Sequence, residues 1–147
     1  MITPDAALKG FYARASQDAG MKTALGTKAA TGSPARFYEG WPADTLTASD
    51  LPRATYYMVA PATRRPGVYR VRLEVDGWFW PAAGAAAKRE QFTERMIELF
   101  DEQHWSVGEA RLYCTVITPG RDFPAPPDEP MRRMFELRIE VSPGPAI

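Results

Sequence analysis

Between Val68 and Phe100 the spacing of apolar residues changes from every second position to helical spacing. The first half alternates apolar and charged residues, and this period of two is typical of a strand with one face on a core. In the second half, Phe92, Met96 and Leu99 recur three and four positions apart. The pattern predicts a strand from Val68, then an amphipathic helix over about residues 82–103, with the apolar sides of the two covering each other.

The same reading predicts elements on either side of this unit. Threonine, proline and an acid at Thr3, Pro4 and Asp5 are a typical helix start. Strand-forming residues recur in three further segments, and prolines bound a short aromatic one. The predicted elements are a helix at about 4–18, a short edge strand at 36–42, and strands at 54–60, 111–118 and 134–141.

Together these elements predict an α+β fold in two layers. We expect an antiparallel sheet of about four strands, with a long amphipathic helix packed on one face and an N-terminal helix beside it. A length of 147 residues and a hydrophobic fraction of 45% fit a single domain covering residues 1–147. Within it we expect a flexible stretch at about 21–34, a proline-rich loop at 119–130 and a frayed tail at 143–147.

The amino-acid composition disfavours several classes of function. Eighteen basic and eighteen acidic residues give a net charge of zero, which does not support a general nucleic-acid binder. One cysteine and one histidine exclude an internal disulfide and disfavour a zinc site. No apolar run reaches membrane-spanning length, and the first residues lack the pattern of a signal peptide. We therefore expect a soluble, intracellular protein with no cofactor, no metal and no membrane partner.

Candidate catalytic residues are few. His104 follows the predicted helix, and Asp101 is close enough in sequence to orient it, but a surface histidine at a helix end explains the pattern better. Cys114 fits a small buried residue in a strand. We expect no enzymatic activity. The alternative that stays open is a small enzyme or ligand-binding domain whose aromatic residues line a pocket containing His104.

Aromatic and charged residues favour a role in assembly instead. Four tryptophans and several phenylalanines and tyrosines exceed what one small core readily takes up, and large aromatics and arginine are enriched at protein interfaces. We therefore predict contact with a partner at a charged strand face, two arginine pairs and one phenylalanine. These interface candidates are Arg64, Arg65, Arg70, Arg72, Glu74, Asp76, Phe123, Arg132 and Arg133.

The order of these segments resembles the tail-terminator and tail-completion proteins of long-tailed bacteriophages. After an N-terminal helix comes the aromatic segment Arg36-Phe37-Tyr38, and residues 51–59 are similar to the proline-led start of the family's first long strand. Residues 69–78 look like the family's V-x-V-D-x-W strand, and residues 135–141 are similar to its closing strand. The segment from Pro119 to Pro130 departs from the family in its proline content.

The resemblance implies a structural virion protein that forms a homohexameric ring around a channel crossed by DNA. One side of the ring would bind the tail-tube protein, and the other the head-completion or connector protein. Assembly would take place in the host cytoplasm, and the product would lie in the tail or neck of the virion. Family members have no catalytic residues. The nearest alternative is another virion joint, a head-closure, neck or tail-tube protein.

Overall fold

The computed structural model describes residues 2–29, 33–42, 46, 50–82, 84–123 and 129–144. Within these residues the helices are α1 (Asp5–Ser16), α2 (Ala19–Leu25) and α3 (Ala85–Phe100). The strands are β1 (Phe37–Glu39), β2 (Arg53–Met58), β3 (Thr63–Arg65), β4 (Val68–Phe79), β5 (Gln103–Val107), β6 (Ala110–Phe123) and β7 (Met131–Pro143).

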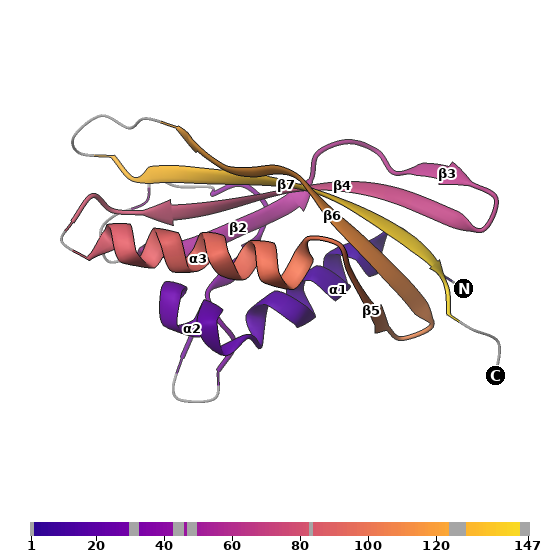
Figure 1. Ribbon diagram of the computed structural model, residues 1–147, viewed down its shortest axis with the longest axis horizontal. Helices are drawn as coiled ribbons and strands as arrows, with labels where there is room; N and C mark the ends of the chain where they lie inside the picture. The colour runs from indigo at the N-terminus through magenta and orange to yellow at the C-terminus, as the bar shows by residue number, and fades with distance from the viewer. Residues whose placement is uncertain are drawn as a thin grey trace.

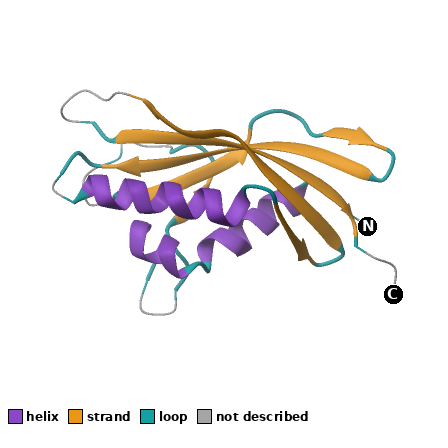
Figure 2. Ribbon diagram, in the orientation of Figure 1, coloured by secondary structure: helices purple, strands orange, loops and turns teal. Residues whose placement is uncertain are grey.

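The strands form one strongly twisted sheet, and the helices gather on one side of it (Figures 1 and 2). The strand order is β1-β2-β4-β7-β6-β5, with β3 paired to the remaining part of β4. The sheet is mixed, because β1 runs parallel to β2 whereas the other pairs are antiparallel. The helices leave the opposite face of β2, β4 and β7 uncovered by any described helix.

The strand and helix expected between Val68 and Phe100 are present as β4 and α3. Val71, Leu73 and Val75 of β4 are fully buried on the helix side of the sheet. Phe92 of α3 packs edge-on against Phe135 of β7, with 5.6 Å between the ring centroids. The two apolar patterns meet in the core as expected, since burying them together removes both from water.

The expected α+β fold with about four strands is wrong. The described residues form a mostly-β fold, a curled mixed sheet of seven strands with three short helices. The expectation of a purely antiparallel sheet is wrong at β1, which runs parallel to β2. A parallel pair needs a connection of about a dozen residues or more, and the segment between β1 and β2 is of that length.

Two of the additional strands are too short to produce a clear alternation. β3 has three residues between the strand expected at 54–60 and the one expected from Val68, and β5 begins shortly after α3 ends. Glu102 between α3 and β5 has a positive φ of 56°, which reverses the chain and ends the helix at Phe100 rather than at residue 103.

Three segments expected to be irregular are partly regular. β6 continues to Phe123, so the expected loop at 119–130 starts later. Its pairing with β7 shifts register twice, once between Val116 and Thr118 and once between Thr118 and Arg121, and the second shift accommodates Pro119 and Gly120. Residues 124–128 of that loop lie outside the described residues, as do 30–32 of the expected flexible stretch and 145–147 of the expected tail. Residues 21–25 of the stretch belong to α2, and Pro143 belongs to β7.

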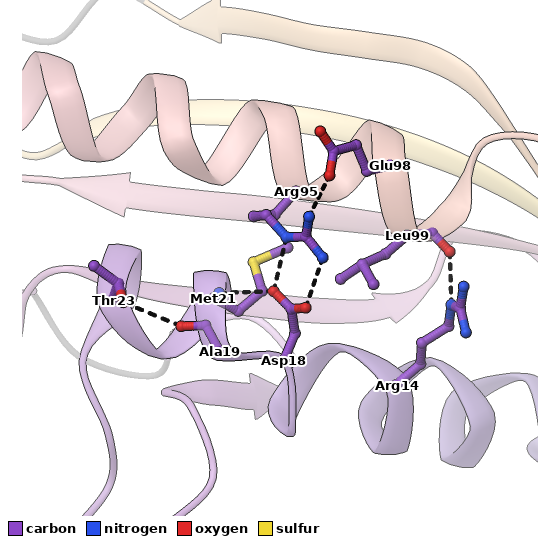
Figure 3. Close-up of polar contacts among 8 residues, drawn as sticks. All are labelled: Arg14, Asp18, Ala19, Met21, Thr23, Arg95, Glu98 and Leu99. Atoms are coloured by element: carbon purple, nitrogen blue, oxygen red, sulfur yellow. Dashed lines mark hydrogen bonds and ion pairs between the residues drawn. The ribbon is translucent and has the colours of Figure 1, made fainter.

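A carboxylate between α1 and α2 joins the helices (Figure 3). Asp18 caps α2 by accepting a hydrogen bond of 2.9 Å from the Met21 amide, and it also accepts bonds of 2.9 and 2.7 Å from Nε and Nη2 of Arg95 in α3. Burial raises the pKa of Asp18, but the hydrogen bonds from Arg95 and Met21 outweigh burial and hold that pKa below its ordinary value. A single side chain thus stabilises the start of one helix and its packing on another.

Replacing Asp18 with alanine should lower the free energy of unfolding by about 2 kcal/mol, because a cap and a partly buried ion pair are lost together. Urea denaturation followed by circular dichroism measures the change. Glu98→Ala is the matched control, since Glu98 pairs with the same Arg95 from an exposed position, and it should cost under about 0.5 kcal/mol. Equal losses for the two variants would contradict the role given to Asp18.

Candidate interface on the outer face of the sheet

We call the side of β2, β4 and β7 that faces away from the helices the outer face. Side chains alternate along a strand, so burying Val71, Leu73 and Val75 places Arg70, Arg72, Glu74 and Asp76 together on this face. Tyr57 lies opposite Glu74 in the β2–β4 register, and Arg132 lies opposite Trp78 in the β4–β7 register. Six of the nine interface residues predicted from the sequence lie on this face or contact it. Five are on its strands, Arg70, Arg72, Glu74, Asp76 and Arg132, and Phe123 at the end of β6 contacts Arg132.

At one end of the outer face, charged residues pair across the strands. Arg70 Nη2 lies 3.1 Å from Glu140 Oε1, and Arg72 Nε donates a 2.7 Å hydrogen bond to Glu136 Oε1. These pairs are partly or largely exposed, so each contributes at most about 1 kcal/mol to stability. This end of the face is a hydrated surface held by cross-strand ion pairs.

At the other end, Arg132 lies at the centre of a more buried group. Its Nε donates a 2.8 Å hydrogen bond to Asp76 Oδ1, and its Nη2 lies 3.3 Å from Glu74 Oε2. The Tyr57 hydroxyl donates a 2.5 Å hydrogen bond to the same Glu74 oxygen. We call Tyr57, Glu74, Asp76 and Arg132 the Arg132 cluster.

Aromatic rings surround the guanidinium of Arg132. Its central carbon lies 4.2 Å from the ring centroid of Phe123 and 4.9 Å from that of Trp41. Trp41 in turn packs edge-on against Trp78, with centroids 5.3 Å apart. Stacking of this kind stabilises a cation at a protein surface and fixes its orientation. Trp41 is still 53% exposed, so the rim of the cluster presents a large aromatic surface to solvent.

Burial governs the electrostatics of the cluster. Burial, assisted by the hydrogen bond and the negative charge of Glu74, raises the pKa of Asp76 to about 7, although Arg132 acts in the opposite direction. Asp76 Oδ2 is buried and accepts no hydrogen bond from the described residues. A proton held between Asp76 and Glu74 would satisfy that oxygen. Burial and the bond to Glu74 likewise raise the pKa of Tyr57.

The predicted Arg64–Arg65 site lies away from the cluster, on a two-stranded projection that we call the arm. It consists of β3 and the first residues of β4, with Arg64 opposite Tyr69 and Arg65 opposite Val68. All three residues of β3 are exposed, and the arm extends beyond the rest of the sheet in Figure 1. The Arg64 guanidinium lies 5.6 Å from the Tyr69 ring centroid. Within the described part of the chain, neither arginine forms an ion pair with a carboxylate.

Arg133 lies on the opposite side of the sheet from Arg132, because neighbouring residues of a strand face opposite ways. It binds both carboxylate oxygens of Asp122 at 2.7 and 2.9 Å, and its Nη1 donates bonds of 2.9 Å to Glu90 and Thr93 of α3. The hydrogen bond to Asp122 raises the pKa of Arg133 further above its ordinary value. Arg133 ties α3 to the β6–β7 end, and we leave it out of the candidate interface.

His104 and Cys114 occupy ordinary structural positions. The His104 ring lies at a tilt against the Tyr113 ring with centroids 4.5 Å apart, beside an open depression of about 390 Å³. Asp101, the carboxylate that a catalytic His104 would need, accepts a 3.2 Å hydrogen bond from the Val116 amide. Burial raises the pKa of the Cys114 thiol to about 12. Across the described ranges, no three His, Cys, Asp or Glu side chains converge on a possible metal position.

Sequence reasoning missed Tyr57 as a member of the cluster. Its strand contains apolar residues on both sides, so the sequence gives no indication that one side faces Glu74. Trp41 was expected only as one of several aromatics in excess of the core. The pairing of β2 with β4 is the information that joins them, and it cannot be read from either strand alone.

Among the described residues, no helix combines the length and the apolar character needed to cross a membrane. Comparison with protein-family models, with curated proteins and with solved structures gave no match for this chain.

Proposed function

We propose that this protein is a structural subunit that assembles into a closed ring, as the tail-terminator and tail-completion proteins of long-tailed bacteriophages do. The observation that carries the proposal is the outer face, which no described helix covers and which ends in the half-exposed Trp41 beside Arg132. Tryptophan, tyrosine and arginine in one partly desolvated group are the residues that concentrate binding energy at protein interfaces.

The two edges of the sheet differ, which favours an assembly in which one surface of a copy contacts a different surface of the next. β5 ends the strand order on one side, and β1, only three residues long, ends it on the other. The second side of β5 has no strand partner among the described residues, and open edges of this kind are natural contact points. A contact between two different surfaces repeats head to tail, and it closes into a ring when the rotation allows.

In this proposal the ring binds the last ring of a tail tube on one side and a head-completion or connector protein on the other. DNA passes through the channel. A chain with zero net charge suits such a conduit, because a strongly basic lining would hold the phosphate backbone rather than let it slide.

The proposal predicts that the purified protein forms single rings. Analytical ultracentrifugation over a wide concentration range should give a mass that is a whole multiple of 16.4 kDa, with six copies expected, and negative-stain electron microscopy should show rings with a central opening. A monomer or dimer at every concentration would overturn the proposal. Long tubes instead of single rings would assign the chain to the tail-tube proteins.

A further inference from the structure

The outward face of α3 carries a row of like charges. Glu90, Glu94 and Glu98 are four residues apart and exposed, so their side chains lie along one line of the helix. Like charges at this spacing destabilise a helix on its own. In α3 the ion pairs of Glu90 with Arg133 and of Glu98 with Arg95 offset this effect, and Glu94 has no such pair among the described residues. Glu90 and Glu98 remain 65% and 63% exposed in the pairs they form.

An exposed apolar residue interrupts this acidic surface. Ile97 lies beside Glu94 and Glu98 and is 39% exposed, although the neighbouring Met96 is fully buried. An isolated exposed isoleucine is common, but one flanked by carboxylates matches the arrangement of an interface, in which a small apolar centre lies within a charged rim.

The arm has the complementary character. Arg64 and Arg65 project to opposite faces of β3, and the edge of β3 that is not paired with β4 is open among the described residues. When this open edge lies along a helix, one guanidinium group can contact the helix from each face of the strand. Both cations lack a carboxylate partner in the described part of the chain, whereas Arg70 and Arg72 on the same hairpin are paired. In Figure 1 the arm extends away from α3 of its own chain. The two surfaces are therefore positioned to meet between copies.

We propose that the arm of one copy docks on the outward face of α3 of the next copy. Arg64 and Arg65 would pair with Glu94 and Glu98, and Ile97, beside these glutamates, would be covered by the arm. This inference rests on the proposed ring and names the contact that closes it. A second copy is the occupant because the chain supplies both halves of the charge match, and its eighteen basic residues balance its eighteen acidic ones. The two surfaces differ, so the contact is head to tail, as a ring requires.

A charge-exchange experiment tests this contact. Three variants are compared with the wild-type protein by analytical ultracentrifugation and electron microscopy: Arg64→Glu with Arg65→Glu, Glu94→Arg with Glu98→Arg, and all four changes together. Either double variant should weaken assembly about tenfold or more, because like charges then face each other across the contact. The fourfold variant should regain most of the wild-type assembly. Lys9→Glu, at an exposed position on α1, is the control and should leave assembly unchanged.

The outcomes separate the two proposals. Wild-type rings that persist in both double variants, or a fourfold variant no better than either of them, would overturn the docking contact and leave the proposed function in place. A wild-type protein that never assembles would overturn both. Circular dichroism of each variant shows whether the fold is kept. Wild-type assembly should also weaken between about 50 mM and 500 mM salt, over which screening between exposed charges increases.

Discussion

Replacing Arg132 with alanine is expected to lower the free energy of unfolding by about 3 kcal/mol, the largest effect we expect from a single change on the outer face. Arg132 is the cation shared by Glu74 and Asp76, whose side chains are only 13% and 0% exposed. Its removal leaves two desolvated carboxyl groups without a positive charge. It also removes the stacking partner of Phe123 and Trp41, which adds to the loss.

Urea denaturation of Arg132→Ala at about pH 8 gives the change directly. Arg72→Ala is the matched control, because Arg72 lies on the same face and also pairs with a glutamate, but is 52% exposed. The control should cost under about 1 kcal/mol. If Arg132→Ala costs no more than its control, the cluster is a surface feature and the anchoring role of Arg132 is wrong.

The difference between these two arginines also bears on the proposed interface. Arg72 is largely hydrated, whereas Arg132 is held by two carboxylates and two aromatic rings before any partner arrives. A pre-ordered side chain loses less conformational entropy on binding, so a partner gains more from Arg132 than from an exposed arginine. We expect the Arg132 end of the outer face to form the stronger contact.

Short-range patterns in the sequence predict the outer face of β4 well. The alternation through Arg70, Arg72, Glu74 and Asp76 places these four side chains on one surface, because a strand has a fixed period of two. The same rule separates Arg132 from Arg133, which the sequence presents as a simple basic pair. Once β7 is known to begin at Met131, the alternation puts Arg133 on the helix side and excludes it from the outer face.

What the sequence does not reveal depends on pairing between distant segments. Glu74 and Arg132 are joined because β4 and β7 are neighbours in the sheet, and Tyr57 is added by the register of β2. The short strands β3 and β5 escape notice for a related reason. All three residues of β3 are polar and exposed, and the strand is held by its pairing with β4. β5 has only two apolar residues on its inner side, Trp105 and Val107, which is too short a pattern to identify a strand before its pairing with β6 is known.

The buried carboxyl of Asp76 has a consequence for the pH dependence of stability. Its pKa in the folded protein is about 7, compared with an ordinary value of 3.8. Between these two values the folded protein holds a proton that the unfolded chain has lost, so raising the pH through this window lowers the free energy of unfolding. The stabilisation is complete below about pH 4 and is lost as the pH rises through about 7.

Asp76→Asn should remove this dependence. An asparagine imitates the protonated acid, because its oxygen can accept the bond from Arg132 and its amide can donate toward Glu74. We expect the stability of the variant relative to the wild type to be about 2.5 kcal/mol greater at pH 8 than at pH 5, since the wild type loses about 1.4 kcal/mol per pH unit between pH 5 and the Asp76 pKa of about 7. Urea denaturation at both pH values provides the comparison.

Asp122→Asn is a control of opposite sign for this experiment. The hydrogen bond from Arg133 lowers the pKa of Asp122, although burial opposes this effect. The Asp122 carboxylate therefore stabilises the folded protein at pH values above the ordinary pKa of an aspartate, and this stabilisation is lost as the pH falls. Removing this charge should therefore destabilise the protein at pH 8, where Asp76→Asn stabilises it.

If Asp76→Asn is instead destabilising at pH 8, Asp76 is ionised in the folded protein and its charge is fully balanced by Arg132. Asp76 would then be half of an ordinary ion pair.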